Sequence, residues 1–157
     1  MIQIRLAIAE DIPVLVAMGR QALEETRYQA FKFDETKVRK SAEAYMADQR
    51  GKYGILVAVD DGKIVGYLFA MAEAYWFCDS VVATNISWFV LPEARGTSAA
   101  TKLVLGFQRW AKNRGADEVR LMVSSGYLID RTDKMLRRMG FSHVGGNYAL
   151  SLKTESN

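Results

Sequence analysis

The residues best suited to bind an anion lie between a strand-like segment, residues 85–91, and an amphipathic helix pattern. Small side chains let a phosphate approach the backbone closely, and the free N–H groups at a helix N-terminus attract anions. An arginine at the start of the run adds a positive charge. The pattern therefore predicts a phosphate or pyrophosphate site formed by Arg95, Gly96, Thr97, Ser98, Ala99 and Ala100.

The composition predicts one soluble globular domain and excludes several kinds of protein. The 157 residues are 50% hydrophobic and 25% charged, and no apolar run approaches the roughly 20 residues that span a bilayer. No basic stretch followed by an apolar block opens the chain, so no signal peptide is expected. The single cysteine, Cys78, excludes an internal disulfide and fits a reducing, cytoplasmic location, and with one histidine, His143, no metal site is expected.

Hydrophobic periodicity predicts the elements that position the anion site. Three helices are expected to begin near an N-cap at Asp11, Asp34 or Thr132, and an Asp61-Gly62 turn joins two strands as a hairpin. Strand patterns cover residues 2–6, 54–59, 63–70, 85–91, 119–123, 143–144 and 148–150. Helix patterns cover residues 12–23, 35–46, 99–114 and 133–139.

The resulting order, β-α-α-β-β-β-α-β-α-β-β, predicts an α/β (α+β) domain of three layers. Its central sheet is expected to be mixed and mostly antiparallel, with six or seven strands and about four helices. A single domain over residues 1–153 is expected, followed by a frayed tail at 154–157.

Three motifs in this order resemble the GNAT superfamily of acyl-CoA-dependent N-acetyltransferases, over nearly the whole chain. The hairpin V-A-V-D-D-G-K-I-V-G-Y, residues 57–67, is similar to the family's second and third strands. The run F-V-L-P-E-A-R-G-T-S-A-A, residues 89–100, resembles its acyl-CoA motif, although Ser98 stands where glycine is usual. Met135–Phe141 resembles its late helix and Gly-Phe turn. R-G-T-S-A-A with the later S-S-G and R-T is similar to a branch found in phages and prophages.

The resemblance implies that acetyl-CoA is the co-substrate and lies between splayed fourth and fifth strands. Its pantetheine arm would pair with the backbone of Phe89, Val90 and Leu91, and its pyrophosphate would bind residues 95–100. The Val90 N–H would stabilise the oxyanion of the tetrahedral intermediate. The implied reaction is direct acetyl transfer to a primary amine in a ternary complex.

Two catalytic residues common in the family are not at their usual positions. Asn85 and Ser87 stand on the strand that often carries a carboxylate, and Leu136 stands where a late-helix tyrosine is usual. Glu73 is the candidate base and Tyr127 the candidate acid toward the thiolate. Asn85 and Ser87 could position a water instead.

The acceptor is left open by the sequence, and small amines and peptides both fit. Tyr28, Phe31 and Phe33 lie where the family's acceptor site is often lined, and the family is often dimeric. A structural role is favoured for His143, and Cys78 is interpreted as a plain thiol. No membrane partner is expected.

Two other functions fit the residues. The missing carboxylate and tyrosine suit a catalytically weak protein that binds CoA. The net charge of +3 suits a small basic nucleic-acid-binding domain, which is the less favoured alternative.

Overall fold

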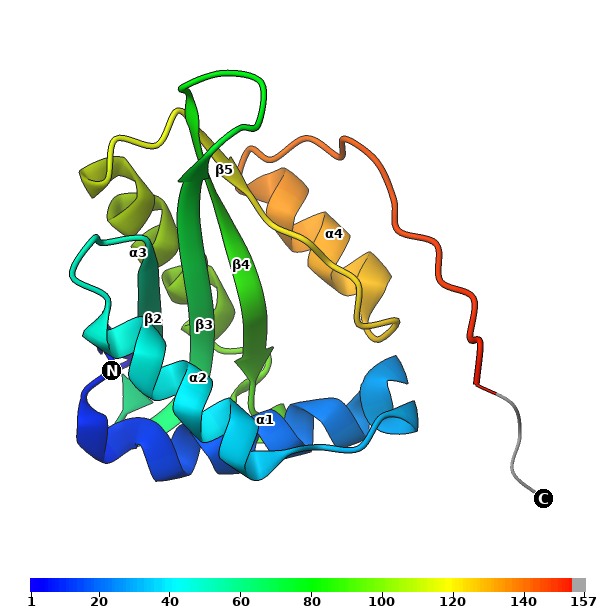
Figure 1. The fold of residues 1–157 in the computed structure, drawn as a ribbon. Helices are drawn as coiled ribbons and strands as arrows, with labels where there is room; N and C mark the ends of the chain where they lie inside the picture. Colours follow the sequence, from blue (N-terminus) through cyan, green and yellow to red (C-terminus); the bar gives the residue numbers. More distant parts are fainter. Residues whose placement is uncertain (154–157) are drawn as a thin grey trace.

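One mixed sheet forms the centre of the molecule (Figure 1). The computed structural model describes residues 1–153. Five strands lie in the order in which they occur in the chain, and β1 to β4 are antiparallel whereas β4 and β5 are parallel. The strands are β1 (Gln3–Leu6), β2 (Tyr53–Asp60), β3 (Lys63–Ala74), β4 (Val81–Val90) and β5 (Glu118–Arg120).

Helices cover both faces of this sheet, which confirms the predicted three layers. One face packs on α1 (Ile12–Glu25) and α2 (Glu35–Ala47), around Leu15, Val57 and Phe69. The other face packs on α3 (Ala99–Asn113), whose buried stripe includes Leu103 and Phe107. The fourth helix, α4 (Ile129–Arg138), lies beside β5 (Figure 1). Short 3₁₀ turns occupy Ala9–Asp11, Arg27–Ala30 and Pro92–Ala94.

Local signals placed two turns as expected. Asp34 caps α2, since its Oδ1 accepts from the N–H of Lys37 at 3.0 Å. The hairpin turn between β2 and β3 has positive φ at both Asp61 (47°) and Gly62 (78°), which suits the twist of antiparallel strands.

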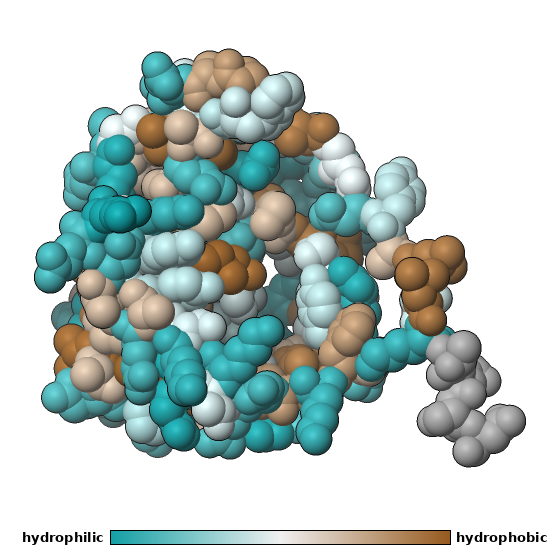
Figure 2. All heavy atoms as spheres, viewed as in Figure 1, coloured by the Kyte–Doolittle hydropathy of each residue, from teal (hydrophilic) through white to brown (hydrophobic). Residues whose placement is uncertain are grey.

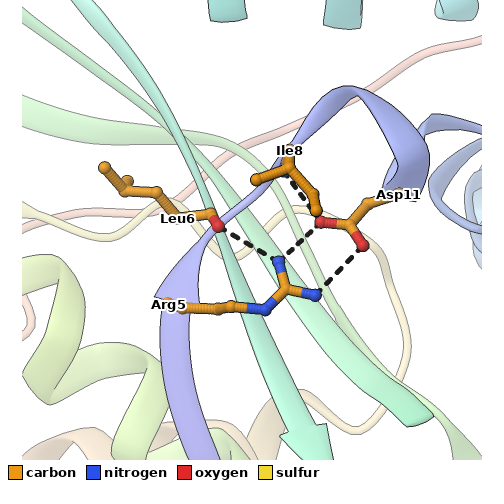
Figure 3. Close-up of polar contacts among 4 residues, drawn as sticks. All are labelled: Arg5, Leu6, Ile8 and Asp11. Carbon is orange, nitrogen blue, oxygen red and sulfur yellow. Dashed lines mark hydrogen bonds and ion pairs between the residues drawn. The ribbon is translucent and has the colours of Figure 1, made fainter. Parts of the chain in front are cut away.

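The predicted capping role of Asp11 is wrong. Its carboxylate turns back to β1 instead of toward α1, accepting from Arg5 Nη1 at 2.6 Å and Nη2 at 3.1 Å (Figure 3). The N–H of Ile8 donates to the same carboxylate at 2.8 Å. Because Asp11 is buried, two charge-assisted bonds from an arginine stabilise it better than a single helix N–H would. Asp11 therefore fastens the start of α1 to the edge of the sheet.

Three other boundaries differ from the sequence prediction. β4 begins at Val81, four residues earlier than expected, and β5 ends at Arg120, three residues earlier. α4 begins at Ile129 after Leu128, whose φ of 52° is left-handed, so Thr132 lies inside the helix and does not cap it.

The sheet has five strands in the described residues where six or seven were expected. Residues 143–144 and 148–150 form no strand, and every residue from Ser142 to Lys153 is exposed. Their alternating pattern is that of a strand, but nothing in the described chain pairs with them. The predicted frayed tail, 154–157, lies outside the described residues. Within residues 1–153, no helix has the length and apolar character to cross a membrane.

Candidate active site

A large cleft opens where β4 and β5 separate. The two strands pair only between Val82–Thr84 and Glu118–Arg120, and beyond this point they diverge (Figure 1). The cleft has a volume of about 980 Å³. It is lined by residues 85–90 of β4, the start of α3, residues 122–125 after β5 and one face of α4, with α1 and α2 opposite. A volume of this size lies at the upper end of the range for small-molecule and cofactor sites.

Asn85 holds the divergence in place. Its amide Nδ2 donates to the carbonyl of Met122 at 3.0 Å, and its Oδ1 accepts from the Met122 N–H at 2.7 Å. Next to it the register with β3 shifts, because Phe69 pairs with Ser87 and Ala70 with Asn85, which leaves Ile86 as a bulge. Where the backbone pairing of β4 with β5 has stopped, the Asn85 side chain therefore bonds the two segments instead. Both the oxygen and the nitrogen of its amide are occupied.

Beyond the bulge, no strand within residues 1–153 pairs with the edge of β4 that faces the cleft. The N–H of Leu91 donates to the Val65 carbonyl of β3 at 2.9 Å. Successive residues of a strand point their N–H groups to opposite edges, so the N–H of Val90 faces the cleft. The Val90 carbonyl accepts from Arg95 Nε at 3.1 Å. An extended ligand could add to this edge like a further strand.

The turn from β4 to α3 supplies several free donors to the same cleft. Gly96 has a φ of +85°, a value that favours glycine, and because it has no side chain a ligand can approach the backbone of the turn. Ser98 has a φ of −78°, a value that suits any residue, so serine at this position causes no strain. Within the described chain, no acceptor engages the N–H groups of Ser98, Ala100 and Thr101 at the start of α3. These groups and the helix dipole favour an anion.

Arg95 turns away from this helix start. Its guanidinium pairs with Glu25 at the end of α1 and bonds the Val90 carbonyl, and it also lies 5.6 Å from the ring centroid of Phe89 and 5.7 Å from that of Tyr127. The side chains of Arg95 and Glu25 are both largely buried. Arg95 therefore fixes the end of β4 to α1, and its charge is matched inside the protein.

A cation that the sequence reasoning missed lies beside the anion site. A Cβ built on Gly96 would be 3.8 Å from Nη2 of Arg131, which belongs to α4. Lys134 and Arg138 line the cleft as well. Their spacing of three and four residues places Arg131, Lys134 and Arg138 on one side of the helix. This spacing is visible in the sequence and could have indicated a basic helix face.

A pair of hydroxyls lines the cleft, one on the buried Tyr67 and one on the half-buried Ser87. The phenol of Tyr67 and the hydroxyl of Ser87 are 3.0 Å apart, and both residues line the cleft. Burial raises the pKa of Tyr67, and its hydrogen bond with Ser87 opposes that rise only in part. Tyr67 therefore stays protonated near neutral pH and holds the Ser87 hydroxyl in place.

The turn after α1 is bonded to the loop after β5. The N–H of Arg27 donates to the Ser125 carbonyl at 3.0 Å, and its Nε donates to the Ser124 carbonyl at 2.6 Å. The hydroxyls of Tyr28 and Ser124 are 3.0 Å apart. These contacts join the two sides of the cleft at the end farthest from the β4–β5 pairing (Figure 1).

The structure brings together only some of the predicted catalytic and acceptor residues. Tyr28, Phe33 and Tyr127 line the cleft. Phe31 does not line the cleft, and the centroid of its ring instead lies 4.7 Å from Lys153 Nζ. Glu73 also lies outside the cleft, paired with Lys52 at 3.2 Å. His143 is exposed in the C-terminal segment.

Comparison with known proteins agrees with this geometry. Residues 20–141 match the model of the Acetyltransferase (GNAT) family. No curated protein gives a significant match.

Solved structures that resemble the chain over almost its full length include three with different descriptions. A transcriptional regulator from Bacillus halodurans C-125 has 18% identity and a TM-score of 0.80, over 97% of this chain and 100% of the other. AAC(6')-Iy, in complex with the bisubstrate analogue CoA-S-monomethyl-acetylneamine, has 19% identity and a TM-score of 0.76, over 99% of both chains. A ribosomal-protein-alanine N-acetyltransferase from Brucella melitensis biovar Abortus 2308 has 14% identity and a TM-score of 0.72, over 98% and 100%. At this identity the likeness shows the fold.

Proposed function

Because the chain belongs to the GNAT acetyltransferase family, we propose that it transfers an acetyl group from acetyl-CoA to a primary amine by direct attack in a ternary complex. The observation that carries the proposal is the unpaired edge of β4, which leads directly to the free N–H groups at the start of α3. One ligand with an amide-rich arm and a pyrophosphate matches both features. A cytoplasmic location, expected from the single cysteine, is part of the proposal. Membership of the phage and prophage branch stays a prediction.

Acetyl-CoA has matching partners along the cleft. Its pantetheine amides add along residues 89–91 of β4, where the backbone of Val90 faces the cleft and the N–H of Leu91 is bonded to β3. Its pyrophosphate binds the backbone of the turn from Arg95 to Ala100. The positive charge beside it comes from Arg131, because Arg95 is paired with Glu25.

The chemistry makes one bond and breaks one bond. The amine nitrogen attacks the thioester carbonyl carbon, the carbonyl oxygen becomes negative, and collapse of the intermediate breaks the C–S bond. The Val90 N–H stabilises the oxyanion, and the Tyr127 hydroxyl donates a proton to the departing thiolate. The amine proton leaves through water held by the Ser87 hydroxyl, because both ends of the Asn85 amide are engaged with Met122. We give Glu73 no role, since it lies outside the cleft.

The acceptor binds in the part of the cleft between α1 and α2, beside Tyr28 and Phe33. Arg20 lies 4.8 Å from the centroid of the Phe33 ring and steadies it. The aromatic rings suit the carbon skeleton of a small amine or of a peptide end.

Calorimetry with acetyl-CoA, followed by a thiol-release assay over a panel of amines, tests the proposal. The sharpest variant is Val90→Pro, which removes the N–H facing the cleft and keeps the neighbouring ladder bond of Leu91. We expect Val90→Pro to lower kcat about 100-fold or more, whereas Val90→Ala, which keeps the N–H, loses far less. Equal losses in both variants would refute the oxyanion role, and no binding of acetyl-CoA at millimolar concentration would refute the function.

The placement of Glu73 favours one second candidate, a CoA-binding protein with little catalysis. Among the described residues that line the cleft, both carboxylates are engaged, because Glu25 is paired with Arg95 and Asp34 caps α2. Tight CoA binding without turnover on any amine would support this function. Turnover that falls in Tyr127→Phe and Ser87→Ala would exclude it.

A further inference from the structure

The charged side chains that line the cleft are mostly positive. Among the described residues of its wall, six side chains are cationic, namely Lys32, Lys37, Arg95, Arg131, Lys134 and Arg138. Two are carboxylates, Glu25 and Asp34. Figure 2 shows the molecule hollowed between the part that holds the sheet and α4, with hydrophilic residues (teal) over α2 along the lower edge of the hollow. A cleft lined by one sign of charge concentrates ligands of the opposite sign.

These cations divide between two opposite walls of the cleft. Three belong to α4, and Arg131 among them lies beside Gly96 at the proposed pyrophosphate site. Lys32 lies in the connector after α1 and Lys37 in the first turn of α2, on the wall where the acceptor is proposed to bind. The phosphates of acetyl-CoA therefore match the cations of α4, and those of the other wall are left for a different anion.

The protein does not neutralise the two lysines of the acceptor wall. Neither Lys32 nor Lys37 forms an ion pair in the part of the chain that the structure describes. Asp34 accepts from the backbone N–H of Lys37 at 3.0 Å, and the dipole of α2 opposes its negative charge. Glu35 does not line the cleft and bonds Arg20 at 3.3 Å. The acceptor wall thus keeps an excess of positive charge.

A third cation lies next to the aromatic residues of the acceptor region. The guanidinium of Arg27 is 4.4 Å from the ring centroid of Tyr28, and its Nη2 donates to the Tyr28 hydroxyl at 3.1 Å. Its Nε is fixed by the bond to the Ser124 carbonyl. No carboxylate within residues 1–153 pairs with Arg27. The ring proposed to hold the carbon skeleton of the acceptor therefore also lies in a positive environment.

The bonds that fix Arg27 also limit the size of the acceptor. Residues 27–28 are bonded to residues 124–125, which joins the two sides of the cleft at that end. An extended polymer cannot pass through a cleft that is closed in this way. The closure favours a compact acceptor that enters the cleft whole.

We propose that the acceptor is a small amine that also carries an anionic group, a carboxylate or a phosphate, and that Lys32 and Lys37 bind this group. Because it rests on the acetyl transfer proposed above, this assignment names the substrate class of the same site. The anion bonds the lysines while the carbon skeleton packs on Tyr28 and Phe33. The same cations disfavour the protonated form of the bound amine, which suits a cleft whose two carboxylates are engaged. A polycationic acceptor would bring like charges together at this wall.

Pairs of amines that differ in the anionic group test the assignment in the thiol-release assay with acetyl-CoA. Phenylalanine is compared with phenylalaninamide, and phosphoethanolamine with ethanolamine, while spermidine serves as the polycation. We expect kcat/KM to be about 10- to 100-fold higher for the anionic member of one pair, and that pair identifies the anion as carboxylate or phosphate. A nearby anion raises the pKa of an amine, so a larger fraction of free amine cannot produce this preference.

Variants on the acceptor wall test the two lysines. Lys32→Gln combined with Lys37→Gln should raise the KM for the preferred anionic amine about tenfold or more, and Lys37→Arg should keep most of the preference. Lys40→Gln is the matched control, because Lys40 is an exposed lysine of α2 that does not line the cleft. Lys32 and Lys37 are also exposed, so thermal unfolding of all these variants should match that of the wild type.

The possible outcomes separate the acceptor class from the acetyl transfer itself. Equal kcat/KM within both pairs, or a preference for spermidine, would overturn the assignment and leave acetyl transfer in place. A preference that persists in the double lysine variant would overturn the role of Lys32 and Lys37. Binding of acetyl-CoA without transfer to any of these amines would refute the proposed function, and the acceptor class with it.

Discussion

Replacement of Asn85 by alanine tests whether this side chain sets the angle between β4 and β5. The amide makes two hydrogen bonds to the Met122 backbone, at 3.0 and 2.7 Å, and Asn85 itself is only 6% exposed. Each bond contributes about 0.5–1.5 kcal/mol net. Because Met122 is 44% exposed, water can reach its freed backbone groups, so we expect a loss of about 1–3 kcal/mol in unfolding free energy.

The neighbouring residue offers a matched control. Thr84 is also buried on β4, but its hydroxyl finds no hydrogen-bond partner within the described chain. Thr84→Val removes a buried hydroxyl whose burial is uncompensated, so we expect a change within about 0.5 kcal/mol or a gain in stability. The two substitutions should thus change the unfolding free energy by different amounts, and in opposite directions where Thr84→Val stabilises the protein.

Urea denaturation followed by fluorescence measures both variants. With a slope of about 2 kcal/mol/M, Asn85→Ala should lower the midpoint by about 0.5–1.5 M. Calorimetry should show weaker acetyl-CoA binding in Asn85→Ala than in Thr84→Val, because the cleft wall after β5 loses its anchor. A midpoint for Asn85→Ala equal to or above that of Thr84→Val would refute the reasoning.

Three further predictions concern the anion site, the edge of the sheet and the core. Arg131→Gln should weaken CoA binding, measured by calorimetry, about three- to tenfold, and the loss should be larger at low salt. Arg137→Gln on the same helix is the control and should leave the affinity unchanged, since Arg137 does not line the cleft. The arginine bonded to Asp11 holds the pKa of that carboxyl below its ordinary value, so its stabilisation is complete above about pH 4 and is lost as pH falls through the lowered pKa. Asp11→Asn should therefore be less stable than wild type at pH 7 by urea denaturation, and the gap should close in acid; a gap that is constant with pH would contradict this. Gly54→Ala would place a Cβ 2.4 Å from Trp110 Nε1 and should cost about 1–3 kcal/mol in thermal unfolding, and an unchanged Tm would contradict the packing.

Local patterns in the sequence were sufficient for the element order and the family motifs. A continuous apolar run placed β2, and the Asp-Gly turn joined it to β3. The spacing of Leu103 and Phe107 placed α3, and the small residues of 96–100 marked the helix start that lines the cleft. These features depend on residues close together in the chain, where propensity and periodicity act directly. Val90 came from the family resemblance, and the structure orients its N–H toward the cleft, while its catalytic role stays a prediction.

Contacts between distant residues decided what the local patterns had left open. Only the fold pairs Arg95 with Glu25 and leaves Arg131 beside Gly96, and only the fold places Glu73 outside the cleft. Asn85 illustrates the reason: its two partners are backbone groups 37 residues away, which no spacing rule reveals.

The end of the chain shows the same division. The alternation at 148–150 predicts a strand, but a strand exists only where an edge pairs with it, and residues 1–153 of one chain provide no pairing there. The sequence by itself determined which segments can become helices, strands and an anion-binding turn. The tertiary structure decided which charges face the cleft and which edges stay open, because both depend on partners brought together only by folding.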